Sequence, residues 1–157
     1  MMSKIVKTIT AIALPLILIY GLYVIAHGHL TPGGGFQGGA IVASGLAMIV
    51  VAFGSVWTMK KVKEKQLSIL ESLGALGFIS LAFLGLLFSA NVFFDNFLIG
   101  QNSLPIFNEI GQGLSNINTA GVIPFMNFAV GLKVIAGLFA IVLVMAYATT
   151  KLEGIEE

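Results

Sequence analysis

The sequence predicts an all-α integral membrane protein with four transmembrane helices in a single domain, residues 1–157. Two compositional facts carry the prediction: 57% of the residues are hydrophobic and only 10% are charged, with a mean hydropathy of +1.00. This is more apolar surface than a water-soluble domain of this length can bury. The third observation is pattern, because the apolar residues fall into four runs close to the roughly 20 residues that cross a bilayer core.

The first run, residues 5–26, is interpreted as a membrane span and not as a secretory leader. A leader has a shorter apolar region followed by a cleavage site of small residues, whereas this run is long. Pro15 lies inside the run, so a kink near the middle of the helix is expected, with the freed carbonyl satisfied by neighbouring helices.

A glycine-rich stretch, HGHLTPGGGFQGG, follows the first run and holds both histidines of the chain, His27 and His29. One or two glycines at positive φ satisfy an ordinary turn, so this much glycine predicts a loop that is closely packed by its neighbours. The residues that define this glycine motif are Gly28, Pro32, Gly33, Gly34, Gly35, Phe36, Gly38 and Gly39.

Three other interpretations of the glycine motif have less support. Gly33, Gly35 and Gly38 match the dinucleotide-binding pattern G-x-G-x-x-G, but that pattern has meaning only after a strand in a βαβ unit. A phosphate-binding P-loop is excluded because no Lys-Ser or Lys-Thr follows the glycines. A flexible linker remains the weaker alternative, since such linkers lack the His, Pro and Phe placed here.

The second run, residues 40–57, is the shortest span, and the third covers residues 67–90. For Gly39 and the residues before it two alternatives stay open: the start of the helix, or a segment that dips into the membrane and is covered there by protein or water. A lysine-rich connector, residues 60–65, joins the two spans. Glycines in the third span would allow another helix to approach closely.

A long loop, residues 91–124, separates the third span from the last, residues 125–149. Loops of this length are usually functional or interaction surfaces. Its FFDNFLIG and LPIFNEIG stretches are expected to lie on the membrane surface. The chain then closes with a short acidic tail.

Lysine placement predicts the orientation. Four crossings put seven lysines on one side of the membrane: Lys4, Lys7, Lys60, Lys61, Lys63, Lys65 and Lys151. Lysine-rich segments stay in the cytoplasm, so both termini are predicted to be cytoplasmic in a multi-pass protein of the cell membrane. The glycine motif and the long loop then face outward, and the four helices are expected to form one compact, thin bundle.

Two charged residues lie within the predicted spans. Lys133 falls about eight residues into the last span, roughly 12 Å deep, where a lysine costs about 2.5 to 3.5 kcal/mol and needs a carboxylate, carbonyls or water. Glu71 falls about 6 Å into the third span from the opposite side, where the helix dipole favours a carboxylate. In a core about 30 Å thick their depths differ by roughly 12 Å, so Lys133 is expected to find its partner in another subunit.

Several classes of function are excluded or disfavoured. The chain has no cysteine, which removes disulfides, thiolate catalysis and iron-sulfur ligation, and its formal net charge of +1 argues against nucleic acid as a partner. Two histidines spaced i, i+2 could bind a metal only with further ligands, so no metal site is predicted. No pairing of nucleophile and base appears, so neither a catalytic site nor a cofactor is expected.

The glycine motif, with Glu71 opening a glycine-rich third span and PFMNFAVGLKV in the last span, resembles the MnhB-type component of the Mrp-type (Mnh-type) multisubunit cation/proton antiporters over nearly the whole chain. Homologous subunits occur in membrane-bound hydrogenases and related sulfur-reducing respiratory complexes. The resemblance implies a subunit without its own redox cofactor, working in a complex that couples proton and sodium movement. Outside the glycine motif, the positions that carry over are His27, His29, Glu71, Asn127, Gly131 and Lys133.

The prediction is therefore a non-catalytic subunit of a cation/proton-translocating complex, either a stand-alone antiporter or the membrane arm of a hydrogenase-like complex that holds a redox module. Its expected partners are the lipid bilayer and other membrane subunits. Lys133 is the first candidate for an ion path or buried charge, followed by Glu71, His27 and His29, because histidine changes charge near physiological pH. Two alternatives remain: a purely structural packing subunit and a stand-alone small transporter.

Overall fold

A computed structural model describes residues 3–30, 32–88, 93–98 and 120–153. Within these ranges it contains five α-helices and no β-strand: α1 (Lys4–Ala26), α2 (Gly34–Phe53), α3 (Ser55–Lys61), α4 (Glu64–Phe88) and α5 (Ile123–Glu153). Helices α1, α2, α4 and α5 are each long and apolar enough to cross a membrane. The all-helical class with four membrane-spanning helices is thus confirmed.

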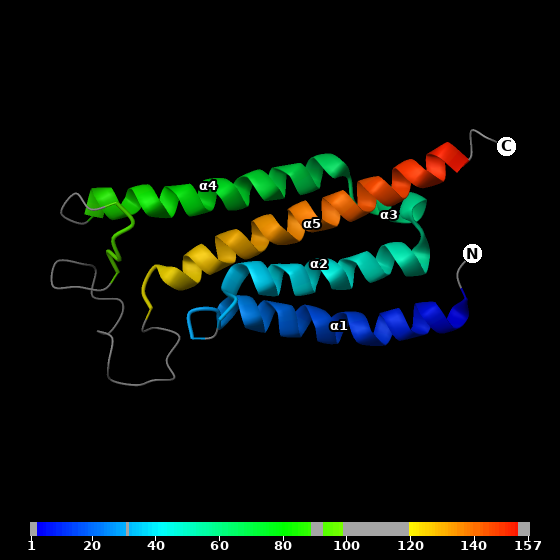
Figure 1. The fold of residues 1–157 in the computed structure, drawn as a ribbon, viewed down its shortest axis with the longest axis horizontal. Helices are drawn as coiled ribbons and strands as arrows, with labels where there is room; N and C mark the ends of the chain where they lie inside the picture. The colour runs from blue at the N-terminus through cyan, green and yellow to red at the C-terminus, as the bar shows by residue number, and fades with distance from the viewer. Residues whose placement is uncertain (1–2, 31, 89–92, 99–119, 154–157) are drawn as a thin grey trace.

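The four long helices lie in a row, in the order α1, α2, α5, α4 (Figure 1). Helix α1 packs on α2, α2 on α5, and α5 on α4, with only a small contact between α1 and α5. This differs from the compact bundle that was expected. Because α1 and α4 each have one main neighbour, only 17% of the most apolar stretch of either helix is buried, against 39% for α2.

Helix α1 begins with a cap, because the Ser3 side chain accepts a hydrogen bond of 3.1 Å from the Ile5 N–H. Such caps satisfy one of the backbone donors that a helix start leaves free. The helix is continuous through Pro15 and ends at Ala26, one turn before His29.

Helix α2 begins at Gly34, before the apolar run that was predicted to start at residue 40. Of the two alternatives left open for the residues before Gly39, the helical one is therefore correct, and the connection from α1 is a short turn. Gly33 (φ +118°) and Gly34 (φ +44°) make this early start possible, since side-chain-bearing residues rarely adopt such backbone angles. Helix α2 ends at Phe53, so Trp57, the expected end of the span, lies in α3.

Helices α4 and α5 also extend beyond their predicted spans. Helix α4 begins at Glu64 instead of residue 67, and its described part ends at Phe88. Helix α5 has 31 residues, from Ile123 to Glu153, and would be about 46 Å long at 1.5 Å per residue. It runs obliquely past α4 and α2 (Figure 1).

Most of the predicted long loop, including LPIFNEIG, lies outside the described residues, but its two ends are described and joined. Asn96 donates a side-chain hydrogen bond to Ala120 O (3.1 Å) and accepts one from the Val122 N–H (3.0 Å). The phenyl ring of Phe94 lies against that of Phe78 of α4, with centroids 5.7 Å apart. The start of the FFDNFLIG stretch therefore packs on the end of α4.

The N-terminus, α3 and the C-terminal end of α5 lie at one end of the molecule (Figure 1). A small core of Val50, Leu67, Phe139 and Leu143 joins α2, α4 and α5. Between α3 and the end of α5, the hydroxyls of Ser55 and Thr150 share a hydrogen bond of 2.9 Å. This end is the lysine-rich end, because all seven lysines outside Lys133 lie in or beside these segments.

Candidate functional site

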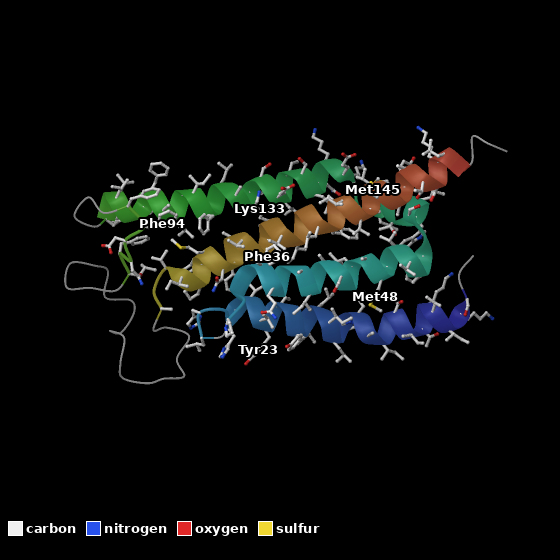
Figure 2. All side chains as sticks on the ribbon, in the orientation of Figure 1. Tyr23, Phe36, Met48, Phe94, Lys133 and Met145 are labelled. Carbon is white, nitrogen blue, oxygen red and sulfur yellow. The ribbon has the colours of Figure 1, made fainter. Side chains whose placement is uncertain are left out.

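The first candidate site is an ion pair between the two charges predicted within the membrane. The ammonium Nζ of Lys133 lies 3.5 Å from the carboxylate Oε1 of Glu71. Lys133 is ten residues after the start of α5, hence roughly 15 Å along the helix. Figure 2 shows Lys133 between α4 and α5, about halfway along the molecule.

This contact corrects the expectation that Lys133 lacks a partner in its own chain. Helix α4 starts three residues before residue 67, and α5 starts two residues before residue 125. At 1.5 Å per residue the earlier starts remove about 7.5 Å of the roughly 12 Å difference in depth. The oblique course of α5 and the reach of the lysine side chain account for the remainder.

Gly74 sets the register of α4 against α5. A Cβ atom built on Gly74 would lie 2.7 Å from both Ala129 O and Lys133 N, distances that real side chains essentially never show. Only glycine lets the two backbones approach this closely. Since Glu71 precedes Gly74 by one helical turn, this contact carries its carboxylate to Lys133.

Gly137 makes room for the carboxylate on the other helix. A Cβ atom built on Gly137 would lie 3.5 Å from both Cδ and Oε1 of Glu71. Neither Gly74 nor Gly137 was predicted as a site residue. A usable signal existed in both cases, because Gly74 follows Glu71 by three residues and Gly137 follows Lys133 by four, the spacings that share a helix face.

The ion pair is only partly satisfied within the chain. Its 3.5 Å separation is longer than the 2.7 to 2.9 Å typical of a charge-assisted hydrogen bond. The side chains of Lys133 and Glu71 stay 49% and 44% exposed. An ammonium has three donors and a carboxylate about four acceptor sites, so both groups retain capacity to bind water, an ion or a neighbouring polar group.

The glycine motif forms the second candidate site, where three helices meet. Gly35 packs on the backbone of α5, and a Cβ atom built there would contact Asn127 O and lie 3.0 Å from Gly131 N. On the other face of α2, a Cβ atom on Gly38 would lie 2.7 Å from Gly21 O of α1. The motif therefore holds α2 between α1 and α5, as close packing predicts.

Gly39 and Gly131 continue this contact, because a Cβ atom on Gly39 would lie 3.0 Å from Gly131 O. Asn127 closes its outer end with a side chain that lies beside Gly28 and Gly34. Its Nδ2 is buried and has no hydrogen-bond partner. The structure thus brings together most of the motif and both of its predicted companions on the last span.

The histidines lie in the turn between α1 and α2. His27 follows the last residue of α1, donates its backbone N–H to Tyr23 O (2.9 Å), and stacks its ring on Tyr23. His29 has both ring nitrogens buried without a hydrogen-bond partner. Pro32 is exposed, as is Phe36 at 63%. These two side chains do not take part in the close contact of the glycines.

The two candidate sites occupy different faces of α5. Gly131 faces α1 and α2, since a Cβ atom there would lie 2.8 Å from Cδ1 of Ile25. Lys133, two residues on, faces Gly74 of α4. Histidines and ion pair are therefore on separate helix contacts. In the part of the chain that the structure describes, no three His, Asp or Glu side chains are grouped closely enough to hold a metal ion.

Known proteins match this architecture. A family model described as "Domain related to MnhB subunit of Na+/H+ antiporter" matches residues 5–140. An uncharacterized protein of Methanocaldococcus jannaschii is 43% identical over 126 residues, which cover 78% of this chain and 44% of that protein. In Staphylococcus epidermidis, a protein named as a candidate antiporter subunit, mnhB2, is 37% identical over 71 residues, covering 44% of this chain and 50% of that protein. The chain thus spans about half the length of these relatives or less.

A solved structure shares the fold. It is a chain of the membrane-bound sulfane sulfur reductase, described as an archaeal respiratory membrane complex. The TM-score is 0.68 at 30% sequence identity, and the match covers 92% of this chain and 58% of that chain.

Proposed function

Because the chain belongs to the family of domains related to the MnhB subunit of Na+/H+ antiporters, we propose that it is a non-catalytic membrane subunit of a complex that couples proton and sodium movement. Its parent is either a stand-alone cation/proton antiporter or the membrane arm of a respiratory complex. The match to a chain of the sulfane sulfur reductase complex favours the second parent, whose redox module would lie on other subunits.

The observation that carries this proposal is the half-exposed ion pair of Glu71 and Lys133. Exposed surface on a membrane helix faces lipid, another subunit or a water-filled cavity. A charge facing hydrocarbon is costly, so intramembrane charges pair, line wet cavities or contact protein. The α4–α5 face at this depth therefore meets a neighbouring subunit or a hydrated path, where a lysine–carboxylate pair can exchange a proton or tune the passage of a cation.

The glycine motif supports a second, structural role in the same subunit. Its contacts place backbone against backbone among α1, α2 and α5, leaving little room for an ion between them. We assign the motif and Asn127 to packing, and the ion pair to the ion path. The histidines, away from the pair, would act only at the outer end of α1.

A direct test is to tag the chain, purify it from its native membranes and identify the subunits that come with it. The complex, reconstituted in vesicles, is expected to move protons in a sodium-dependent manner. Glu71→Gln, which keeps the shape and removes the charge, is expected to reduce flux per assembled complex several-fold. Purification as a homo-oligomer that moves ions by itself would instead support the stand-alone transporter.

The orientation is a further part of the proposal. Seven lysines at the end that holds both termini and α3 place that end in the cytoplasm. Since the chain has no cysteine, single cysteines report cleanly. Leu30→Cys, at the opposite end and 38% exposed, is expected to react with an impermeant maleimide in intact cells. Lys63→Cys is expected to react only after permeabilisation, and the reverse pattern would contradict the orientation.

A further inference from the structure

A cavity of about 430 Å³ lies near the lysine-rich end, where α2, α3, α4 and α5 meet. Its volume is within the range of small-molecule sites. The walls are apolar side chains of three long helices, among them Ile49 of α2, Leu70 of α4, and Ile135 and Phe139 of α5. No charged group lines these walls, so a ligand that enters must present hydrocarbon to them.

Helix α3 gives the same cavity a polar, cationic border. Trp57 and Lys61 line the cavity together with Thr58. Trp57 is 45% exposed, and Lys61 is exposed. Tryptophan and lysine side chains gather at the level of lipid headgroups, where a ring or a long aliphatic stem meets hydrocarbon and a polar tip meets water. The cavity therefore opens at the membrane interface.

The charge around this border is strongly positive. Lys60, Lys63 and Lys65 lie beside Lys61 in the same connector, and Glu64 is the one acid among them. Basic pockets between transmembrane helices bind the headgroups of anionic lipids, and each lysine near the surface contributes about 1 kcal/mol. A phosphate at Lys61 would place an attached chain against Ile49 and Phe139.

We propose that this cavity is a specific site for an anionic phospholipid, with one acyl chain between α2, α4 and α5 and the phosphate at Lys61. Size favours a lipid over a helix of another subunit. An α-helix with its side chains is about 10 Å across and rises about 5.4 Å per turn, so about 430 Å³ holds roughly one turn. A single acyl chain needs no such width.

The cavity contains its own probe, because Trp57 is the only tryptophan of the chain. The full-length chain would be placed in phosphatidylcholine vesicles with a small fraction of brominated lipid. Brominated phosphatidylglycerol is expected to quench Trp57 fluorescence at several-fold lower mole fraction than brominated phosphatidylcholine. Equal quenching by the two lipids would overturn the proposal.

Two variants and one control locate the site. Lys61→Gln is expected to weaken the preference for the anionic lipid about fivefold, as one lysine contact predicts. Ala136→Leu, which adds volume to a wall residue that is 2% exposed, is expected to reduce quenching by either lipid. Lys151→Gln removes a lysine at the same end that does not line the cavity and is expected to change neither. If Lys61→Gln and Lys151→Gln had equal effects, the attraction would be nonspecific and the site would be refuted.

A photo-cross-link decides between lipid and protein in native membranes. With p-benzoylphenylalanine in place of Leu70, irradiation of the assembled complex is expected to attach a phospholipid to this chain. Attachment to another subunit would refute the lipid site there. Neither measurement depends on ion movement, so the outcome is independent of the proposed ion path.

Discussion

Lys133→Ala is expected to lower both the amount of assembled complex and the sodium-dependent proton flux per complex. It removes the partner of Glu71, and leaving one charge of a buried pair stranded typically costs about 3 to 5 kcal/mol. The exposed halves of both side chains would become buried against the neighbouring subunit, so the cost applies to the assembled state. Assembly should be measured first, by yield of the purified complex, and flux afterwards in vesicles.

The double variant Glu71→Leu/Lys133→Met separates structure from transport. Replacing both members of a buried ion pair by apolar groups is often neutral or stabilising, so assembly should recover. Flux should stay low if the pair serves the ion path. Full recovery of flux in the double variant would show that the pair is structural. Lys133→Arg keeps the charge with a planar, differently hydrated group and should retain assembly better than Lys133→Ala.

Gly35→Val is expected to have the second large effect, a loss of the folded subunit and therefore of the complex. Even the first added carbon would contact Asn127 O and lie 3.0 Å from Gly131 N, both backbone atoms that cannot move aside as a flexible side chain can. Overpacking of this kind costs about 1 to 3 kcal/mol or more, and the β-branch of valine adds further crowding. The measurement is the yield of complex, with thermal unfolding of the purified chain.

Gly77 offers a matched control in another membrane helix. A Cβ atom built on Gly77 would lie 3.5 Å from Cβ of Ala129, an ordinary contact. Gly77→Ala is therefore expected to leave assembly unchanged, whereas Gly35→Ala should already reduce it. Equal tolerance of alanine at both positions would favour the interpretation of the glycine motif as a flexible linker.

Several features followed from the sequence alone, because they depend on the free energy of transferring each residue between water and lipid. Long apolar runs predicted the four spans, and the grouping of lysines predicted which segments share an end. The family motif pointed to close packing of the glycines and to Asn127 and Gly131 as their companions. Lys133 and Glu71 stood out because charges are rare in membrane helices.

The tertiary structure decided how these parts meet. Residues 71 and 133 are far apart in the chain, and their contact depends on the register of α4 against α5, set where Gly74 allows the backbones to approach. Counting depth from the ends of apolar runs could not give that register, since an error of two or three residues at each helix start moves a side chain by about 3 to 4.5 Å. Hydropathy likewise could not place Gly34 in a helix. Glycine contributes almost no transfer free energy, so the start of α2 was decided by backbone packing on α1 and α5.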